Sequence, residues 1–127
     1  MYLDWACEPE VHASRSPSPH GFNRICSNDV LAAAADGDGE WPAGAAGMKE
    51  LYDSLTDTEP MGFSVYLKLE DQSDGGKNWY WYERFPSGLI AASAGAGVCT
   101  GCHGRAGNGE ANTPTPGARD YVFTPVR

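Results

Sequence analysis

Two cysteines and a histidine lie close together late in the chain, in the run Cys99-Thr100-Gly101-Cys102-His103. Their order and spacing match the attachment motif of a c-type haem, because each thiol can add to one vinyl group of the porphyrin and the histidine can then reach the iron. A zinc knuckle and a thioredoxin-type redox pair are the alternatives. The first needs four ligands, usually two such pairs, and the second is typical of an α/β pattern. The chain has neither feature. The sequence therefore predicts one covalent haem c, anchored by Cys99 and Cys102 and ligated by His103.

The two remaining cysteines, Cys7 and Cys26, predict a disulfide. An even number of cysteines left over after haem attachment is typical of an exported protein, in which cysteines pair. Two unrelated buried thiols are the alternative. Haem c is normally attached outside the cytoplasm, so we expect a periplasmic protein. Residues 1–9 have neither the basic start nor the apolar middle of a signal peptide, and we expect that an export signal has been removed.

The composition narrows the classes of partner. The chain has 127 residues and a formal net charge of -8, which fits one domain and argues against binding to nucleic acid or to an anionic membrane surface. A basic redox partner, such as another cytochrome, would suit this charge. No apolar run reaches membrane-spanning length. We divide the chain into an N-terminal extension, residues 1–20, and a single haem domain, residues 21–127.

Alternating apolar and polar residues predict a fold built mainly from strands. The predicted strands cover residues 22–26, 45–52, 63–70 and 78–85, with a further short apolar segment at 121–125. The fold class is therefore α+β, with a mostly antiparallel sheet of four to five strands, a few short helices and the haem c packed against the sheet.

The connections carry turn and helix signals. Asp74-Gly75-Gly76-Lys77 is typical of a hairpin turn, and Ser27 or Asn28 caps a short helix that ends at residues 36–39. Residues 89–97 are small and are expected to be helical, which would deliver the haem motif. Residues 104–117 are expected to form a loop.

Six segments of the chain, in order, resemble the cytochrome P-460 family and its relative, the β-sheet cytochromes c′ (cytochrome c′-beta). The haem motif is shared by many unrelated cytochromes, whereas its combination with a Lys-Glu-Leu strand and an Asn-Trp aromatic strand is specific. The matching segments are residues 24–29, 41–52, 65–68, 76–82, 99–103 and 120–124. The resemblance implies a small antiparallel sheet, a five-coordinate haem c and a homodimer.

The signature of this family is a covalent bond from a lysine side chain to a meso carbon of the porphyrin. The match implies that this lysine is Lys49, with Lys68 and Lys77 as its rivals. Lys49 shares a strand face with Ala45 and Gly47, whose small side chains would let a flat ring lie close. Burial against a haem disfavours the ammonium form, so the lysine pKa falls and the amine becomes nucleophilic.

The resemblance also implies a reaction. Crosslinked members of the family oxidise hydroxylamine to nitric oxide and nitrous oxide, and a carboxylate near the open iron position would accept the released protons. No local motif selects this carboxylate. Glu50 and Glu83 are the first candidates, with Glu70 and Asp120 beside them.

Two other functions stay open. A protein similar to cytochrome c′-beta would bind nitric oxide or carbon monoxide under an aromatic cap. A simple electron carrier would need a sixth iron ligand. The candidate caps are Phe22, Phe63, Phe85 and Phe123, and the candidate sixth ligands are His12, His20, Met48 and Met61.

Overall fold

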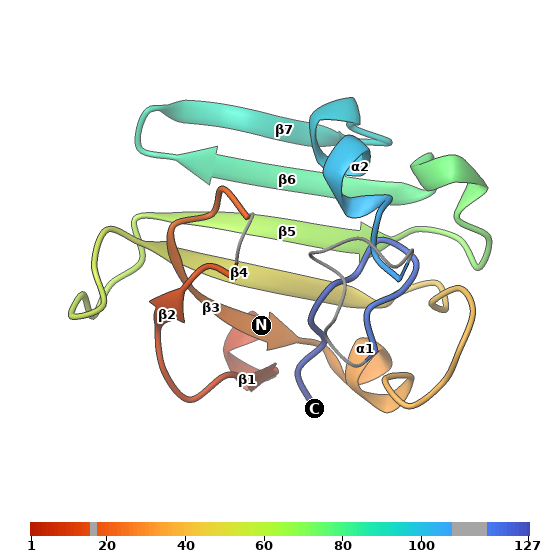
Figure 1. Cartoon of the computed structure of the whole chain (residues 1–127), viewed down its shortest axis with the longest axis horizontal. Helices are drawn as coiled ribbons and strands as arrows, with labels where there is room; N and C mark the ends of the chain where they lie inside the picture. The colour runs from red at the N-terminus through yellow and green to blue at the C-terminus, as the bar shows by residue number, and fades with distance from the viewer. Residues whose placement is uncertain (16–17, 108–116) are drawn as a thin grey trace.

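Seven strands form one antiparallel sheet in the computed structural model, which describes residues 1–15, 18–107 and 117–127 (Figure 1). The spatial order is β1-β3-β4-β5-β6-β7, and β2 also pairs with β3. The strands are β1 (Ala6–Cys7), β2 (His12–Ala13), β3 (Phe22–Ser27), β4 (Ala46–Tyr52), β5 (Gly62–Lys68), β6 (Trp79–Phe85) and β7 (Gly88–Ala94). The helices are η1 (Tyr2–Asp4), α1 (Asp29–Ala33), η2 (Asp74–Gly76) and α2 (Gly97–His103). The predicted α+β class is confirmed.

The four strands predicted from alternation are β3 to β6, and the sheet is larger than predicted because β1, β2 and β7 join it. The turn predicted at residues 74–77 contains η2 and connects β5 to β6. Asn28, rather than Ser27, caps α1, since its side chain accepts a hydrogen bond from the backbone of Leu31 at 2.9 Å. Among the described residues, no helix combines the length and apolar character needed to cross a membrane.

The helix predicted over residues 89–97 is wrong for most of its length, because this segment forms β7 and only its end enters α2. A short turn after Phe85 folds the chain back, and Gly88 adopts a φ of 143° there. β7 then pairs with β6 from Phe85↔Gly88 to Tyr80↔Ala94. Pairing with a neighbouring strand therefore overrides the helical preference of the alanines.

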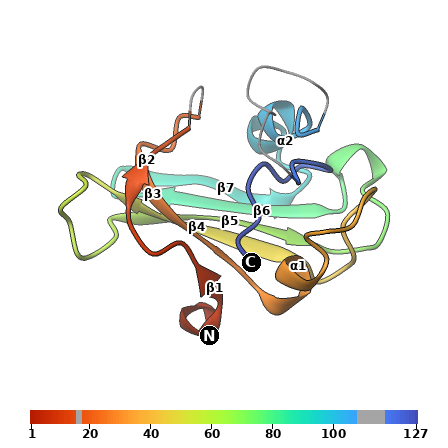
Figure 2. The ribbon, with the colours of Figure 1, turned by 60° about the horizontal axis from the view of Figure 1, so that its bottom comes forward.

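The two faces of the sheet have different surroundings. In Figure 2, α2 and the C-terminal segment lie on one side of the sheet, while η1 and β1 lie towards the other. The face under α2 carries Lys49, its cross-strand partners Ile25 and Ser64, and Glu83, which pairs with Ser64. The main core lies on this side and consists of Leu31, Ala35, Trp41, Ala45, Tyr66, Trp79, Trp81, Ala91 and Val122.

Most of the loop expected at residues 104–117 lies outside the described residues. The apolar segment at residues 121–125 forms no named strand, and its only regular pairing in the described part of the chain is an isolated bridge between Arg119 and Val122.

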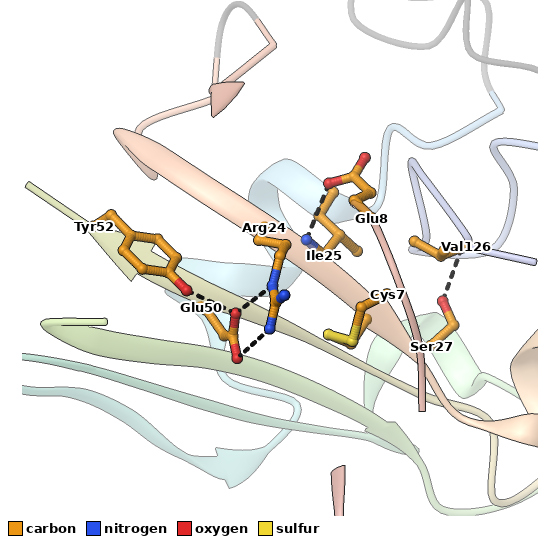
Figure 3. Close-up of a disulfide and its surroundings, with 9 residues drawn as sticks. Cys7, Glu8, Arg24, Ile25, Ser27, Glu50, Tyr52 and Val126 are labelled. Carbon is orange, nitrogen blue, oxygen red and sulfur yellow. Dashed lines mark hydrogen bonds and ion pairs between the residues drawn. A yellow bond between two sulfur atoms is a disulfide. The ribbon is translucent and has the colours of Figure 1, made fainter. Parts of the chain in front are cut away.

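The N-terminal extension is fastened to the sheet at β3. A disulfide joins Cys7 to Cys26, as the sequence predicts, and links β1 to β3 (Figure 3). The next side chain, Glu8, accepts the backbone N–H of Ile25 at 3.0 Å and lies 2.7 Å from His12 Nε2. Burial would raise the pKa of Glu8, but these hydrogen bonds and one from Arg15 lower it below its ordinary value.

Removal of this disulfide is expected to destabilise the fold. The bridge closes a loop with a sequence separation of 19, so the Cys7→Ser/Cys26→Ser variant should lose about 3 kcal/mol of unfolding free energy in the chain-entropy model. Urea denaturation with and without a reductant measures this loss. The reductant should destabilise the native chain and leave the variant unchanged. A variant as stable as the native chain would contradict the prediction.

Candidate functional site

A pocket opens between α2 and the sheet, and it contains most of the residues to which the sequence assigns chemistry. It holds about 930 Å³ of empty space, its open mouth included, and its walls include Lys49, Glu83, Cys99, Cys102 and His103. These residues come from β4, β6 and α2. The fold therefore brings a strand-borne lysine and carboxylate to the same pocket as the two thiols and the imidazole.

The Cys99–His103 motif occupies the last five residues of α2. Cys99, Cys102 and His103 stand at positions i, i+3 and i+4 of a helix and therefore share one face. Both cysteines are free thiols and half-buried. Burial, with a smaller contribution from Glu83, raises the pKa of Cys99 to about 11. The Cys99 thiol is thus protonated at neutral pH, and both cysteines line the pocket.

The imidazole of His103 has the tautomer that an iron ligand needs. Its Nδ1 lies 2.8 Å from the carbonyl oxygen of Tyr121, so Nδ1 carries the proton and donates it, and Nε2 keeps its lone pair. Burial is the main reason that the pKa of His103 falls to about 4, and the ring is neutral at neutral pH. A neutral imidazole oriented by a backbone acceptor is the usual arrangement of a metal-ligating histidine. The donor set therefore fits a haem c.

Lys49 lines the same pocket from β4. Burial, and next the charge of Arg15, lower its pKa to about 8 against the opposing effects of Glu8 and Glu83. The rival lysines do not line the pocket. Lys68 is buried in an ion pair with Asp120, and Lys77 is exposed beside Asp74.

The space expected above Ala45 and Gly47 is not open. Tyr66, the cross-strand partner of Gly47, fills it: a Cβ at Gly47 would lie 2.2 Å from the Tyr66 hydroxyl. Ala45 belongs to the core cluster around Trp41. The small residues therefore make room for Tyr66. The open part of this face begins at the next cross-strand pair on the same face, Lys49 and Ser64, which lines the pocket.

Glu83 is the carboxylate candidate that the fold brings into the pocket. Its Oε2 accepts a hydrogen bond from Ser64 Oγ at 2.9 Å and lies 3.2 Å from His20 Nδ1, in a geometry that falls short of a hydrogen bond. Burial would raise the pKa of Glu83, but His20 and Ser64 outweigh it and lower the pKa below 4.5. Glu83 is therefore ionised at neutral pH.

The other carboxylate candidates lie elsewhere. Glu50 points to the opposite face of the sheet, where it accepts hydrogen bonds from Arg24 at 2.7 and 3.1 Å and from Tyr52 at 2.9 Å (Figure 3). Glu70 is exposed, and Asp120 binds Lys68. Glu50 is adjacent to Lys49 in a strand, so the pleat of the sheet turns it away from the pocket.

One of the candidate sixth ligands and one of the candidate aromatic caps line the pocket. His20 and Phe123 line it, and their ring centroids lie 6.4 and 5.3 Å from that of His103. The other proposed ligands and caps do not line it: His12, Met48, Met61, Phe22, Phe63 and Phe85.

The sequence assigns no chemical role to several residues that line the pocket, among them Arg15, Asn23, Ser64 and Trp81. Alternation within β6 already placed Trp81 beside Glu83, but nothing local indicated Arg15 or Asn23. Within the described residues, three buried atoms at this pocket have no hydrogen-bond partner: Asn23 Oδ1, Trp81 Nε1 and His20 Nδ1. Unpartnered buried polar atoms at a pocket are consistent with a bound group that is polar at its edge.

No protein-family model matches the chain, and a search of curated proteins finds no match in sequence.

Proposed function

We propose that the protein is a mono-haem c-type cytochrome that oxidises hydroxylamine to nitric oxide and nitrous oxide, with a haem crosslinked to Lys49. The observation that carries this proposal is the meeting of Lys49 and Glu83 with Cys99, Cys102 and His103 at one pocket. The resemblance to the cytochrome P-460 family supplies the reaction. When bound, the haem supplies the redox centre and an open iron position.

Each residue of the pocket has a distinct task. Cys99 and Cys102 would hold the ring, and His103 would ligate the iron through Nε2, while its Nδ1–H donates to the Tyr121 carbonyl. Lys49 contributes an amine whose pKa is lowered to about 8, so that part of it is neutral near pH 7 and can act as a nucleophile. Its bond would distort the ring and so tune the potential.

Glu83 Oε2 is the proposed acceptor of protons from the substrate. It is ionised at neutral pH and accepts a hydrogen bond from Ser64, and His20 Nδ1 lies 3.2 Å from it. The electrons leave to a redox partner, for which we propose a basic cytochrome because the net charge of the chain is -8.

The location and assembly of the protein form part of the proposal. The disulfide between Cys7 and Cys26 supports an oxidising compartment such as the periplasm. The resemblance implies a homodimer, which size-exclusion chromatography of the matured protein would detect.

The test is to mature the full chain in a periplasm with haem-attachment machinery. Three results are expected: a red-shifted, broad ferrous absorption band, consumption of hydroxylamine in the presence of an electron acceptor, and haem held by three side chains in a denaturing mass spectrum. A colourless protein would remove the haem assignment. A protein with an ordinary five-coordinate spectrum and no turnover would be a gas-binding cytochrome instead.

Electron transfer is a second candidate because His20 lies at the pocket. A low-spin, six-coordinate spectrum that becomes five-coordinate in His20→Ala would favour this function over hydroxylamine oxidation.

Replacement of Glu83 by glutamine is expected to lower kcat for hydroxylamine by about 100-fold, the usual loss when a general base is removed. Because His20 and Ser64 hold the pKa of Glu83 below its ordinary value, the native rate should not depend on this group near neutral pH. The rate should fall only in the acid range, as the pH drops through that lowered pKa. Steady-state rates from acid to neutral pH measure both effects. Glu70→Gln, which neutralises an exposed carboxylate, is the matched control and should keep the native rate. Equal rates for the two variants would exclude Glu83 as the base.

A further inference from the structure

The carbonyl that orients His103 belongs to an unusual turn. Tyr121 and the preceding Asp120 have φ values of 70° and 38°. The turn is closed by backbone hydrogen bonds in both directions between Arg119 and Val122, at 2.9 and 2.8 Å. Two central residues with positive φ are the pattern of a type I′ turn, which favours Asn and Gly. Aspartate and especially tyrosine keep this conformation only where their surroundings fix it.

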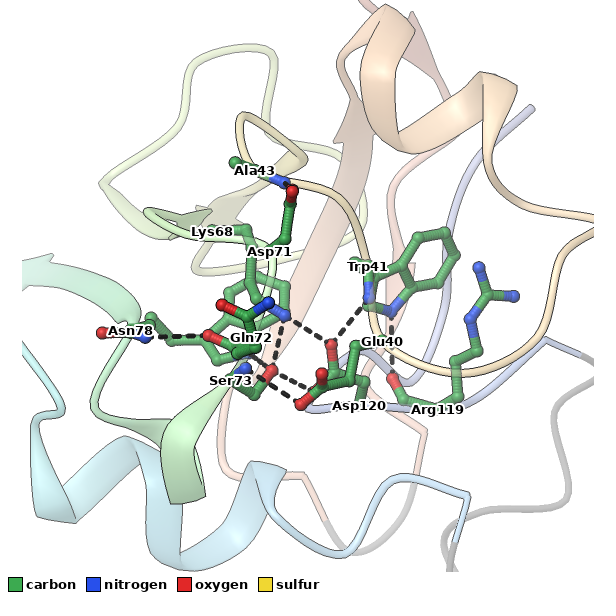
Figure 4. Close-up of polar contacts among 11 residues, drawn as sticks. Glu40, Trp41, Ala43, Lys68, Asp71, Gln72, Ser73, Asn78, Arg119 and Asp120 are labelled. Carbon is green, nitrogen blue, oxygen red and sulfur yellow. Dashed lines mark hydrogen bonds and ion pairs between the residues drawn. The ribbon is translucent and has the colours of Figure 1, made fainter.

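Three buried donors fix the Asp120 side chain (Figure 4). Lys68 Nζ and the backbone N–H of Trp41 each donate to Asp120 Oδ2 at 2.8 Å, and Ser73 Oγ donates to Oδ1. Ser73 Oγ in turn accepts from Lys68 Nζ at 2.5 Å and from Trp79 Nε1 at 3.1 Å. We call Lys68, Ser73, Trp41 and Asp120 the Asp120 clamp. It joins the turn to β5, to the residues before η2 and to the loop after α1.

The residues on both sides of Asp120 are also held. Trp41 Nε1 donates to the carbonyl of Arg119 at 3.0 Å, and the Arg119 guanidinium lies 3.7 Å from the centre of a Trp41 ring. The Tyr121 ring packs closely against Gly76, where a Cβ would lie 3.0 Å from the ring, and a Cβ at Gly104 would be in van der Waals contact with it at 3.4 Å. The Tyr121 carbonyl is therefore fixed from both ends of its residue.

We infer that Asp120 is a positioning residue for the iron ligand, acting through the Tyr121 carbonyl on His103 Nδ1. The effect on the iron rests on the proposed haem ligation, whereas the contacts that orient the His103 ring do not depend on haem. A carbonyl acceptor on Nδ1–H fixes the ring orientation and makes Nε2 a stronger electron donor. Loss of the clamp frees the turn, lengthens the hydrogen bond and weakens this donation.

The clamp acts on the site from a distance. Lys68, Ser73 and Asp120 do not line the pocket, so their replacement leaves the chemistry of the cavity walls unchanged. A purely structural role would lower stability and leave the electronic properties of the ligand as they are. The two roles therefore separate in measurements made on folded protein.

The test uses Asp120→Asn in the full chain, with Asp71→Asn as the matched control. Asp71 accepts the backbone N–H of Ala43 at 2.9 Å on a neighbouring loop and makes no hydrogen bond or ion pair with the clamp among the described residues (Figure 4). In the haem-loaded protein, Asp120→Asn should lower the iron–histidine stretching frequency in resonance Raman spectra. It should also raise the ratio of reduced to oxidised protein about tenfold at a fixed potential, which equals about 59 mV for one electron. Asp71→Asn should change neither quantity.

A measurement without haem separates this inference from the proposed function. Long-range ¹H–¹⁵N correlation spectra of the full chain report the tautomer of His103 directly. The native chain should show the proton on Nδ1, and Asp120→Asn should show both tautomers in exchange. If Asp120→Asn does not fold, Ser73→Ala, which removes one of the three donors, carries the same readouts. An unchanged tautomer, frequency and potential in a folded clamp variant would overturn the inference, even if the haem assignment is correct.

Discussion

Replacement of both Cys99 and Cys102 by alanine is expected to abolish covalent haem attachment in the matured full chain. The two thiols stand on one face of α2 at the wall of the pocket, and no other free cysteine exists in the chain, since Cys7 and Cys26 are bonded to each other. We expect the bond to Lys49 to fail as well. The Lys49 amine can react efficiently with the porphyrin only when the ring is already held beside it by the two thioether bonds, because this raises the effective concentration of the ring at the amine. Haem staining after denaturing electrophoresis measures the loss.

Two sets of variants control for misfolding. Cys7→Ala/Cys26→Ala removes the same number of sulfurs from the edge of the sheet and should retain its haem despite a lower stability. Each single variant, Cys99→Ala or Cys102→Ala, should retain one thioether, visible as a shifted band in the pyridine haemochrome spectrum. Full haem retention in the double variant would show that these thiols are not the anchors.

The local pattern of the sequence was sufficient for the strands and for part of the site. Alternation in β4 separates Lys49 from Glu50, and alternation in β6 groups Glu83 with Trp81. The pattern could not say which of these faces meets α2, because that depends on packing between segments far apart in the chain. Glu50 and Glu83 therefore remained equal candidates until the register between β4, β5 and β6 was known.

Two other expectations failed for reasons that also lie outside the local sequence. The segment that forms β7 is rich in alanine, and its helical preference yields to hydrogen bonds with β6. The small size of Gly47 predicts space for a flat ligand, but the identity of the cross-strand partner decides what covers a glycine. That partner is Tyr66. The clamp around Asp120 was equally invisible, since its members are spread over 80 positions from Trp41 to Asp120 and converge only in the fold.

Replacement of Lys49 by methionine is expected to remove one of three covalent links to the haem. The native amine has a pKa of about 8, so about one molecule in ten carries it neutral at pH 7, against about one in three thousand for an ordinary lysine. Methionine keeps the length and the apolar stem but has no nucleophilic nitrogen. The ferrous band should move to the position of an ordinary c-type haem, hydroxylamine turnover should be lost, and the denaturing mass spectrum should show two attachment sites.

Lys77→Met is the matched control for this variant. Lys77 is exposed beside Asp74 and lies outside the pocket, so its loss should change neither the spectrum nor the number of links. Lys49 differs from it in burial and in position on β4, opposite Ser64 and in the same row as Glu83. If native protein, Lys49→Met and Lys77→Met all carry haem through two links only, the crosslink and with it the case for hydroxylamine oxidation would fail. The haem would then remain as a gas-binding or electron-transfer centre, because Cys99, Cys102 and His103 do not depend on Lys49 for their arrangement on α2.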